Sequence, residues 1–122
     1  MRFKTEKIEN GRHRARCSAR CNPAVLGDEA ELTVEDEGDT PQDAVHKASK
    51  RLLKHRTMLR PDERAKAAAV TYASDKGVRD AATKALEEGV KATPQGAAAY
   101  YIADKLHKNP AFMRAMRQLW GD

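Results

Sequence analysis

Alternation of charged and small side chains in two stretches of the N-terminal third is the feature that most constrains the fold. From residue 12 to 21, odd positions hold His, Ala or Cys and even positions hold Arg or Ser. From residue 29 to 37, Glu or Thr fills every odd position, with Ala30, Leu32, Val34 and Asp36 between them. Successive side chains of a strand point to opposite faces, so a period of two is typical of a strand with one covered face. Both stretches are predicted to be strands.

An earlier strand is predicted to pair with the arginine-bearing one. Asn10-Gly11 separates the two segments, and Asn-Gly is the strongest short signal for a β-hairpin. A two-residue turn leaves Phe3 on the arginine face, whereas a three-residue bulged turn places it beside Ala19 in the core. We favour the bulged turn, because it buries Phe3 and sets Glu6 opposite Arg16.

A basic, amphipathic helix is predicted to follow the acidic strand and to run through Leu59. Thr40 is a suitable N-cap, Pro41 suits the first helical position, and Asp43 completes the start signal. Arg60-Pro61 ends the helix. Its apolar side consists of Ala44, Val45, Ala48, Leu52, Leu53 and Leu59.

The remaining chain is predicted to be helical and alanine-rich. One helix begins at Pro61 and is closed by Gly77, a second covers residues 78–90, a third begins at Thr93-Pro94, and Asn109-Pro110 caps the last. The fold class is therefore α+β: a three-stranded antiparallel sheet plus the basic helix, followed by a helical half. We expect a strand-strand-strand-helix module over residues 1–60 and a helical module over 61–122, packed as one unit.

Several classes of protein are excluded or disfavoured. No window of about 18 apolar residues is present, so no membrane partner is expected. Residues 1–5 lack the apolar segment of a secretory signal, and we expect a cytoplasmic protein. The sequence shows no nucleophile elbow, no glycine-rich phosphate loop and no usable histidine–carboxylate pair, so we expect no enzyme and no cofactor.

The two cysteines do not predict a metal site or a disulfide. Cys17 and Cys21 are four residues apart on one predicted strand, which separates them by about 13 Å. One zinc ion or one disulfide cannot bridge that distance. We expect two buried, reduced thiols.

Charge is strongly segregated along the chain. The net charge is +5, yet residues 28–43 hold eight acidic side chains and no basic one. Residues 1–20 and 47–66 are both basic. Such a balance favours polyanions or acidic protein surfaces as partners, provided that the cations are not paired within the chain.

Two groups of basic residues are candidates for such a partner. Arginines on one strand face repeat about every 6.6 Å, a spacing suited to successive phosphates. The acidic strand, with Glu29, Glu31, Glu35 and Glu37, offers them cross-strand ion pairs instead, and both interpretations stay open. The basic helix has no acid between Asp43 and Asp62; it is either a solvated face or a docking surface. The candidate residues are Arg12, Arg14, Arg16, Arg20, Lys47, Lys50, Arg51, Lys54 and Arg56.

Two resemblances bear on function. The order strand-strand-strand-helix over about residues 2–59 resembles the later part of a double-stranded-RNA-binding domain, although the helix opens Thr40-Pro41-Gln42-Asp43 and its bases start only at Lys47. A small charged sheet followed by Gly38-Asp39-Thr40-Pro41-Gln42-Asp43-Ala44 is similar to small accessory proteins of bacteriophages of the anti-CRISPR type. The latter resemblance implies a protein without catalytic motifs that occupies a surface of a host nucleoprotein complex. If the protein is phage-encoded, its expected location is the cytoplasm of the host cell.

We therefore expect a non-enzymatic binding protein that docks on a host nucleoprotein complex, in the manner of a phage-encoded, anti-CRISPR-like inhibitor. Direct binding of duplex DNA or RNA is the alternative. A second alternative is a structural or assembly protein that forms a homodimer through the apolar stripe of the last helix, which consists of Phe112, Met113, Met116, Leu119 and Trp120.

Overall fold

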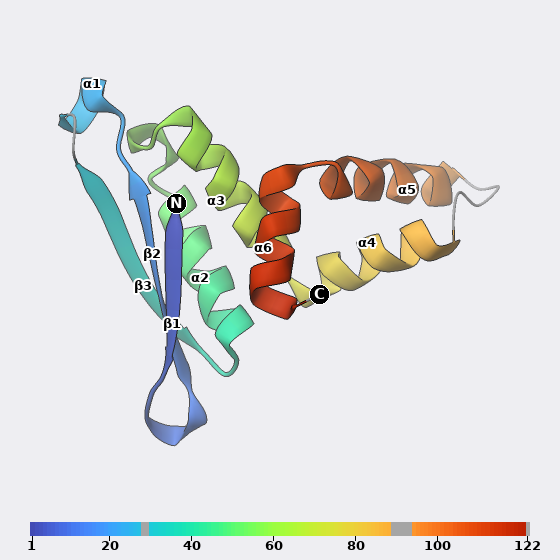
Figure 1. Cartoon of the computed structure of the whole chain (residues 1–122), viewed down its shortest axis with the longest axis horizontal. Coiled ribbons are helices and arrows are strands. Elements are labelled where there is room, and N and C mark those ends of the chain that lie inside the picture. The colour runs from blue at the N-terminus through green and yellow to red at the C-terminus, as the bar shows by residue number, and fades with distance from the viewer. Residues whose placement is uncertain (28–29, 89–93, 122) are drawn as a thin grey trace.

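The computed structural model describes residues 1–27, 30–88 and 94–121 and has an α+β architecture, as the sequence predicts (Figure 1). Strands β1, β2 and β3 form an antiparallel sheet in that order. The strands are β1 (Arg2–Lys7), β2 (His13–Arg20) and β3 (Glu31–Gly38), and the longer helices are α2 (Pro41–Leu53), α3 (Pro61–Ala73), α4 (Lys76–Glu88), α5 (Pro94–His107) and α6 (Pro110–Trp120). The chain also has three short helical segments: η1 (Glu9–Gly11), α1 (Pro23–Leu26) and η2 (Arg56–Met58).

The hairpin register differs from the predicted one by two residues. Phe3 lies opposite Cys17 rather than Ala19, and Glu6 lies opposite Arg14 rather than Arg16. The turn consists of residues 9–11, because the Ile8 N–H donates to the Arg12 carbonyl and so extends the ladder to that pair. Asn10 and Gly11 both have positive φ, a conformation that these two residue types tolerate best. Phe3 still lies on the core face, as predicted, because a shift of two residues preserves the face.

Helix α2 begins as predicted and ends earlier. The Thr40 hydroxyl accepts a hydrogen bond from the Asp43 N–H at 3.0 Å, and Pro41 is the first residue of the helix. The predicted extension to Leu59 is wrong: the helix ends at Leu53. Leu59 is instead extended and forms a β-bridge with Cys21, so this residue is buried by pairing beside the end of β2.

The predicted role of Gly77 as a helix C-cap is also wrong. Helix α3 ends at Ala73, and Gly77 lies in the first turn of α4. The break comes earlier because Asp75 accepts a hydrogen bond from the Val78 N–H at 3.2 Å, which caps the new helix. At the other predicted caps, Asn109 accepts hydrogen bonds at the start of α6, while Thr93 lies outside the described residues.

Small side chains let α2 lie close to the sheet. The face of β2 that carries Ala15, Cys17 and Ala19 packs on the side of α2 that carries Ala44 and Ala48, and all five are almost fully buried. Helices α3 and α6 cover the other side of α2 and add Phe112, the largest fully buried side chain, to the same core. The core therefore crosses residue 60, whereas the α4–α5 hairpin points away from the sheet (Figure 1).

A short polar network joins α2 to α3 inside this packing. Nδ1 of His46 lies 2.9 Å from the Thr71 carbonyl and 3.1 Å from Oγ of Ser74. The Thr71 hydroxyl donates to Ser49 at 2.9 Å. Ser74 is buried and its hydroxyl donates to the Val70 carbonyl, so the His46–Ser74 contact fixes helix packing rather than activating a nucleophile.

Glu63 on α3 is the central buried charge of the fold. Its side chain is 2% exposed, and its carboxylate binds the N-terminal ammonium of Met1 as well as Nε of Arg20 at 2.9 Å. The Arg20 backbone N–H donates to the same carboxylate at 3.2 Å. Burial raises the pKa of Glu63, but the hydrogen bonds from the ammonium and Arg20 outweigh it and lower the pKa to about 2.

We predict that Glu63→Gln destabilises the protein by about 3 kcal/mol at neutral pH, because it leaves the N-terminal ammonium without its counter-charge. The folded-state pKa is depressed, so the carboxylate contributes stability above about pH 4.5, and this contribution is lost as the pH falls through about 2. Urea unfolding of both proteins across this range measures the difference, which should shrink with acidification. A difference that stays constant with pH would contradict the assignment.

Candidate binding surfaces

The outer face of the sheet carries the arginine row, and its members are paired within the chain. Arg12 binds Asp39 at 3.0 Å, and Arg16 binds Glu35 at 2.6 Å. Arg14 lies 3.3 Å from both Glu6 and Glu37. The register causes this arrangement, since β2 and β3 place Arg14 opposite Glu37 and Arg16 opposite Glu35.

The remaining arginines of this region also have acidic partners. Arg2 binds Glu31 at 2.8 Å, and Arg20 turns toward α3, where it binds Asp62 and Glu63. Glu29, the other acid expected to pair with the row, lies outside the described residues. The hydrogen bonds that Arg14 donates to Glu37 and that Arg20 donates to Glu63 raise the pKa of each guanidinium. The outer face is therefore a mosaic of both signs, and exposed pairs of this kind each add about 0–1 kcal/mol to stability.

The basic residues of α2 form one exposed stripe. Lys47, Lys50, Arg51 and Lys54 follow the spacing i, i+3, i+4, i+7 and are all exposed. Two of them are engaged: Lys47 binds Asp43 at 3.4 Å, and Arg51 lies 3.9 Å from Asp36 and donates to the Glu35 carbonyl at 2.6 Å. The contacts of Arg51 hold this part of the stripe against β3, whereas the Lys47–Asp43 pair lies within α2.

The C-terminal end of the stripe is different. Lys50 lies in the last turn of α2, Lys54 is the C-cap, and Arg56 lies in η2 because the helix ends before it. All three are exposed, and among the residues that the structure describes none has a carboxylate within ion-pair distance. We call Lys50, Lys54 and Arg56 the α2 patch; of the nine predicted site residues these three keep their charge available.

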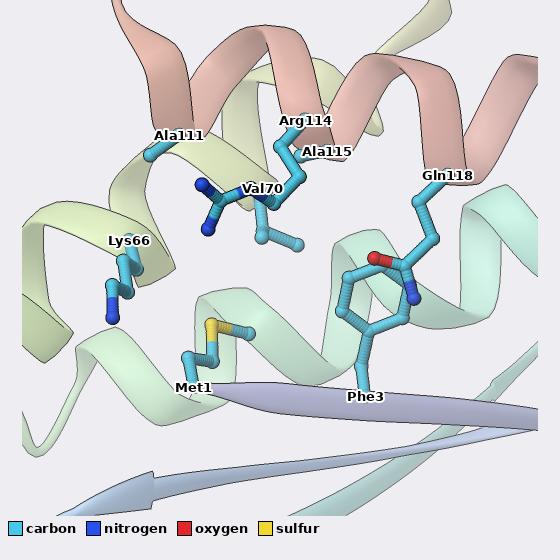
Figure 2. A pocket seen from close by; sticks show the side chains of 8 residues that line it. All are labelled: Met1, Phe3, Lys66, Val70, Ala111, Arg114, Ala115 and Gln118. Atoms are coloured by element: carbon cyan, nitrogen blue, oxygen red, sulfur yellow. The ribbon is translucent and has the colours of Figure 1, made fainter.

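A second cationic feature was not among the predicted site residues. A groove lies between β1 and helices α3 and α6, with Phe3, Val70 and Ala115 among its apolar lining. Figure 2 shows Lys66 of α3 and Arg114 of α6 extending into this groove at its Met1 end. No spacing in the sequence indicates it, because its lining comes from three segments far apart in the chain.

The apolar stripe of α6 is largely covered by the chain itself. Phe112 is fully buried, and Met113, Met116 and Leu119 pack partly buried against the core. Trp120 donates from Nε1 to the Ala73 carbonyl, and the Arg79 guanidinium lies 4.7 Å from its ring centroid. More apolar surface is exposed on α5, where Tyr101 and Ile102 are 58% and 60% exposed.

Within the described residues, no group of three or more His, Cys, Asp or Glu side chains is arranged to hold a metal ion. No described helix has the length and hydrophobicity needed to span a bilayer. Cys17 and Cys21 are both buried free thiols. Comparison with protein-family models, with curated proteins and with solved structures finds no significant match for this chain.

We predict that the thiols of the native protein resist alkylation. Burial raises the pKa of Cys17 to about 12, and the thiolate is the reactive form. Iodoacetamide at pH 8, with labelling followed by mass spectrometry, should modify neither cysteine in buffer and both in denaturant. Rapid modification of Cys17 under native conditions would contradict its placement in the core.

Proposed function

We propose that this chain is a non-enzymatic binding protein that docks on a nucleoprotein complex through the α2 patch, in the manner of an anti-CRISPR-type inhibitor. The observation that carries the proposal is the contrast between the two predicted cationic surfaces. The arginines of the sheet are paired internally, whereas Lys50, Lys54 and Arg56 are exposed and have no carboxylate partner among the described residues. Cations of this kind suit phosphates or an acidic protein surface.

The size of the patch favours a composite partner over naked nucleic acid. Three cations that each meet one phosphate give a salt slope of about −3, which is a loss of roughly 40-fold between 50 and 200 mM salt. Autonomous duplex binders make more phosphate contacts and lose about 10³-fold or more. A nucleoprotein surface supplies protein contacts in addition to phosphates, so three cations suffice to orient the chain on it. Direct duplex binding remains the alternative.

The dimeric assembly protein receives less support. Its interface would use the α6 stripe, and the buried position of Phe112 and the half-buried position of Met113 and Met116 leave little of that stripe to meet a second copy. A stable dimer needs a contiguous apolar surface. The exposed Tyr101 and Ile102 of α5 offer a different surface for such a contact.

We predict that Lys50→Glu/Lys54→Glu abolishes capture of the nucleoprotein partner while the fold survives, because both side chains are exposed and unpaired. Arg51 is left in place, since its guanidinium holds β3. The measurement is affinity capture from lysate on the tagged protein, with protein and nucleic acid in the eluate identified together. Circular dichroism and thermal unfolding of the variant should match those of the unchanged chain.

Lys76→Glu/Lys84→Glu on α4 is the matched control, because it changes net charge equally at two exposed lysines. It should retain the complex. Equal capture by all three proteins would overturn the role of the α2 patch. Fluorescence anisotropy with labelled duplex DNA and RNA tests the alternative: tight binding with a salt-dependent loss of about 10³-fold would favour direct duplex recognition.

A further inference from the structure

Strand β1 has a free edge. The sheet order β1-β2-β3 leaves one side of β1 without a strand, and every residue of β1 except Phe3 is exposed. The Ile8 N–H bonds to the Arg12 carbonyl, and hydrogen-bonded positions alternate along an antiparallel pair. Backbone groups of Arg2, Lys4 and Glu6 therefore face β2, while those of Phe3, Thr5 and Lys7 point away from the sheet.

The groove described above opens beside the start of this free edge, at Met1 and Phe3 (Figure 2). The charged side chains Lys66 and Arg114 lie at the Met1 end of the groove, whereas the uncharged Gln118 lies at its Phe3 end (Figure 2). Among the residues that the structure describes, neither Lys66 nor Arg114 has an ion pair or a hydrogen bond from its charged group. An added strand would place alternate side chains into this groove.

The charges along the β1 edge indicate which side chains such an added strand would carry. The β1 edge also presents Lys4 and Lys7, which are exposed and without an acidic partner among the described residues. Lysines on an edge oppose pairing with a second copy of the same basic edge. They favour an acidic strand. Among the side chains of that strand that point into the groove, Lys66 and Arg114 favour a carboxylate at one position. Phe3 favours an apolar residue at the next position that points into the groove.

We propose that the β1 edge and its groove bind an extended, acidic segment of a partner protein, which pairs as a fourth strand and directs a carboxylate toward Lys66 and Arg114. Backbone bonds to Phe3, Thr5 and Lys7 give affinity, and the inward side chains give specificity. This surface lies at β1, whereas the α2 patch belongs to the helix whose stripe is held against β3. A result that contradicts one of the two proposals therefore leaves the other unaffected.

The test uses an N-acetylated, C-amidated peptide of about eight residues in which inward positions alternate glutamate and valine and outward positions are threonine. Amide hydrogen exchange is followed by NMR with the peptide at millimolar concentration. We expect new protection at Phe3, Thr5 and Lys7 and unchanged exchange at Arg2, Lys4 and Glu6. A peptide with lysine in place of glutamate, and one with proline at alternate positions, should give no protection.

Two variants examine the two parts of the site. Thr5→Pro removes an N–H that points away from β2, and edge strands tolerate proline there; Lys66→Gln/Arg114→Gln removes the cations. Each should weaken peptide binding at least tenfold, whereas Lys50→Glu/Lys54→Glu should not change it. Absence of protection in the unchanged chain, equal protection by the lysine peptide, or full binding by Thr5→Pro would each overturn the proposal. Protection that rises with protein concentration alone would assign the edge to a second copy instead.

Discussion

The buried carboxylate of Glu63 is the interaction on which the arrangement of the two halves depends. It joins the N-terminal ammonium at the start of β1, Arg20 at the end of β2, and helix α3 in one charged cluster. A carboxylate with so little access to water is stable only when its charge is compensated, so this cluster fixes α3 over the sheet. Helix α6 packs on α3 and thereby forms the far wall of the β1 groove.

Pairing of charges within the sheet decides which cations remain for a partner. The acidic strand lies beside the arginine strand in a register that sets glutamate against arginine at three positions. The acids thus neutralise the surface that, from its arginine spacing alone, most resembles a phosphate-binding row. Beyond this sheet, Lys50, Lys54 and Arg56 have no carboxylate within ion-pair distance among the described residues, and Lys54 and Arg56 follow the end of α2 at Leu53.

The sequence predicts the elements of this fold better than it predicts its surfaces. Alternation and capping residues are local signals, so the three strands and the start of α2 at Thr40 follow from them. The hairpin register is set by the Ile8–Arg12 backbone pair, and more than one turn length fits the Asn-Gly signal. The end of α2 depends on a residue distant in the sequence, because Leu59 pairs with Cys21 instead of continuing the helix. The groove at Lys66 and Arg114 has no local signal, since only tertiary packing brings its walls together.

The two proposed binding surfaces flank opposite edges of one sheet. Contacts from Arg51 to β3 place the stripe of α2 beside one edge, and the groove of Phe3, Lys66 and Arg114 opens at the other. Between them lies a face whose charges are already matched, which contributes little attraction of its own. A partner that reaches both edges would gain from effective concentration, because occupation of one surface holds an acidic segment near the other. For such a partner the charge-matched face would act as a spacer, and selectivity would depend on the distance between two acidic features of the partner rather than on its total charge.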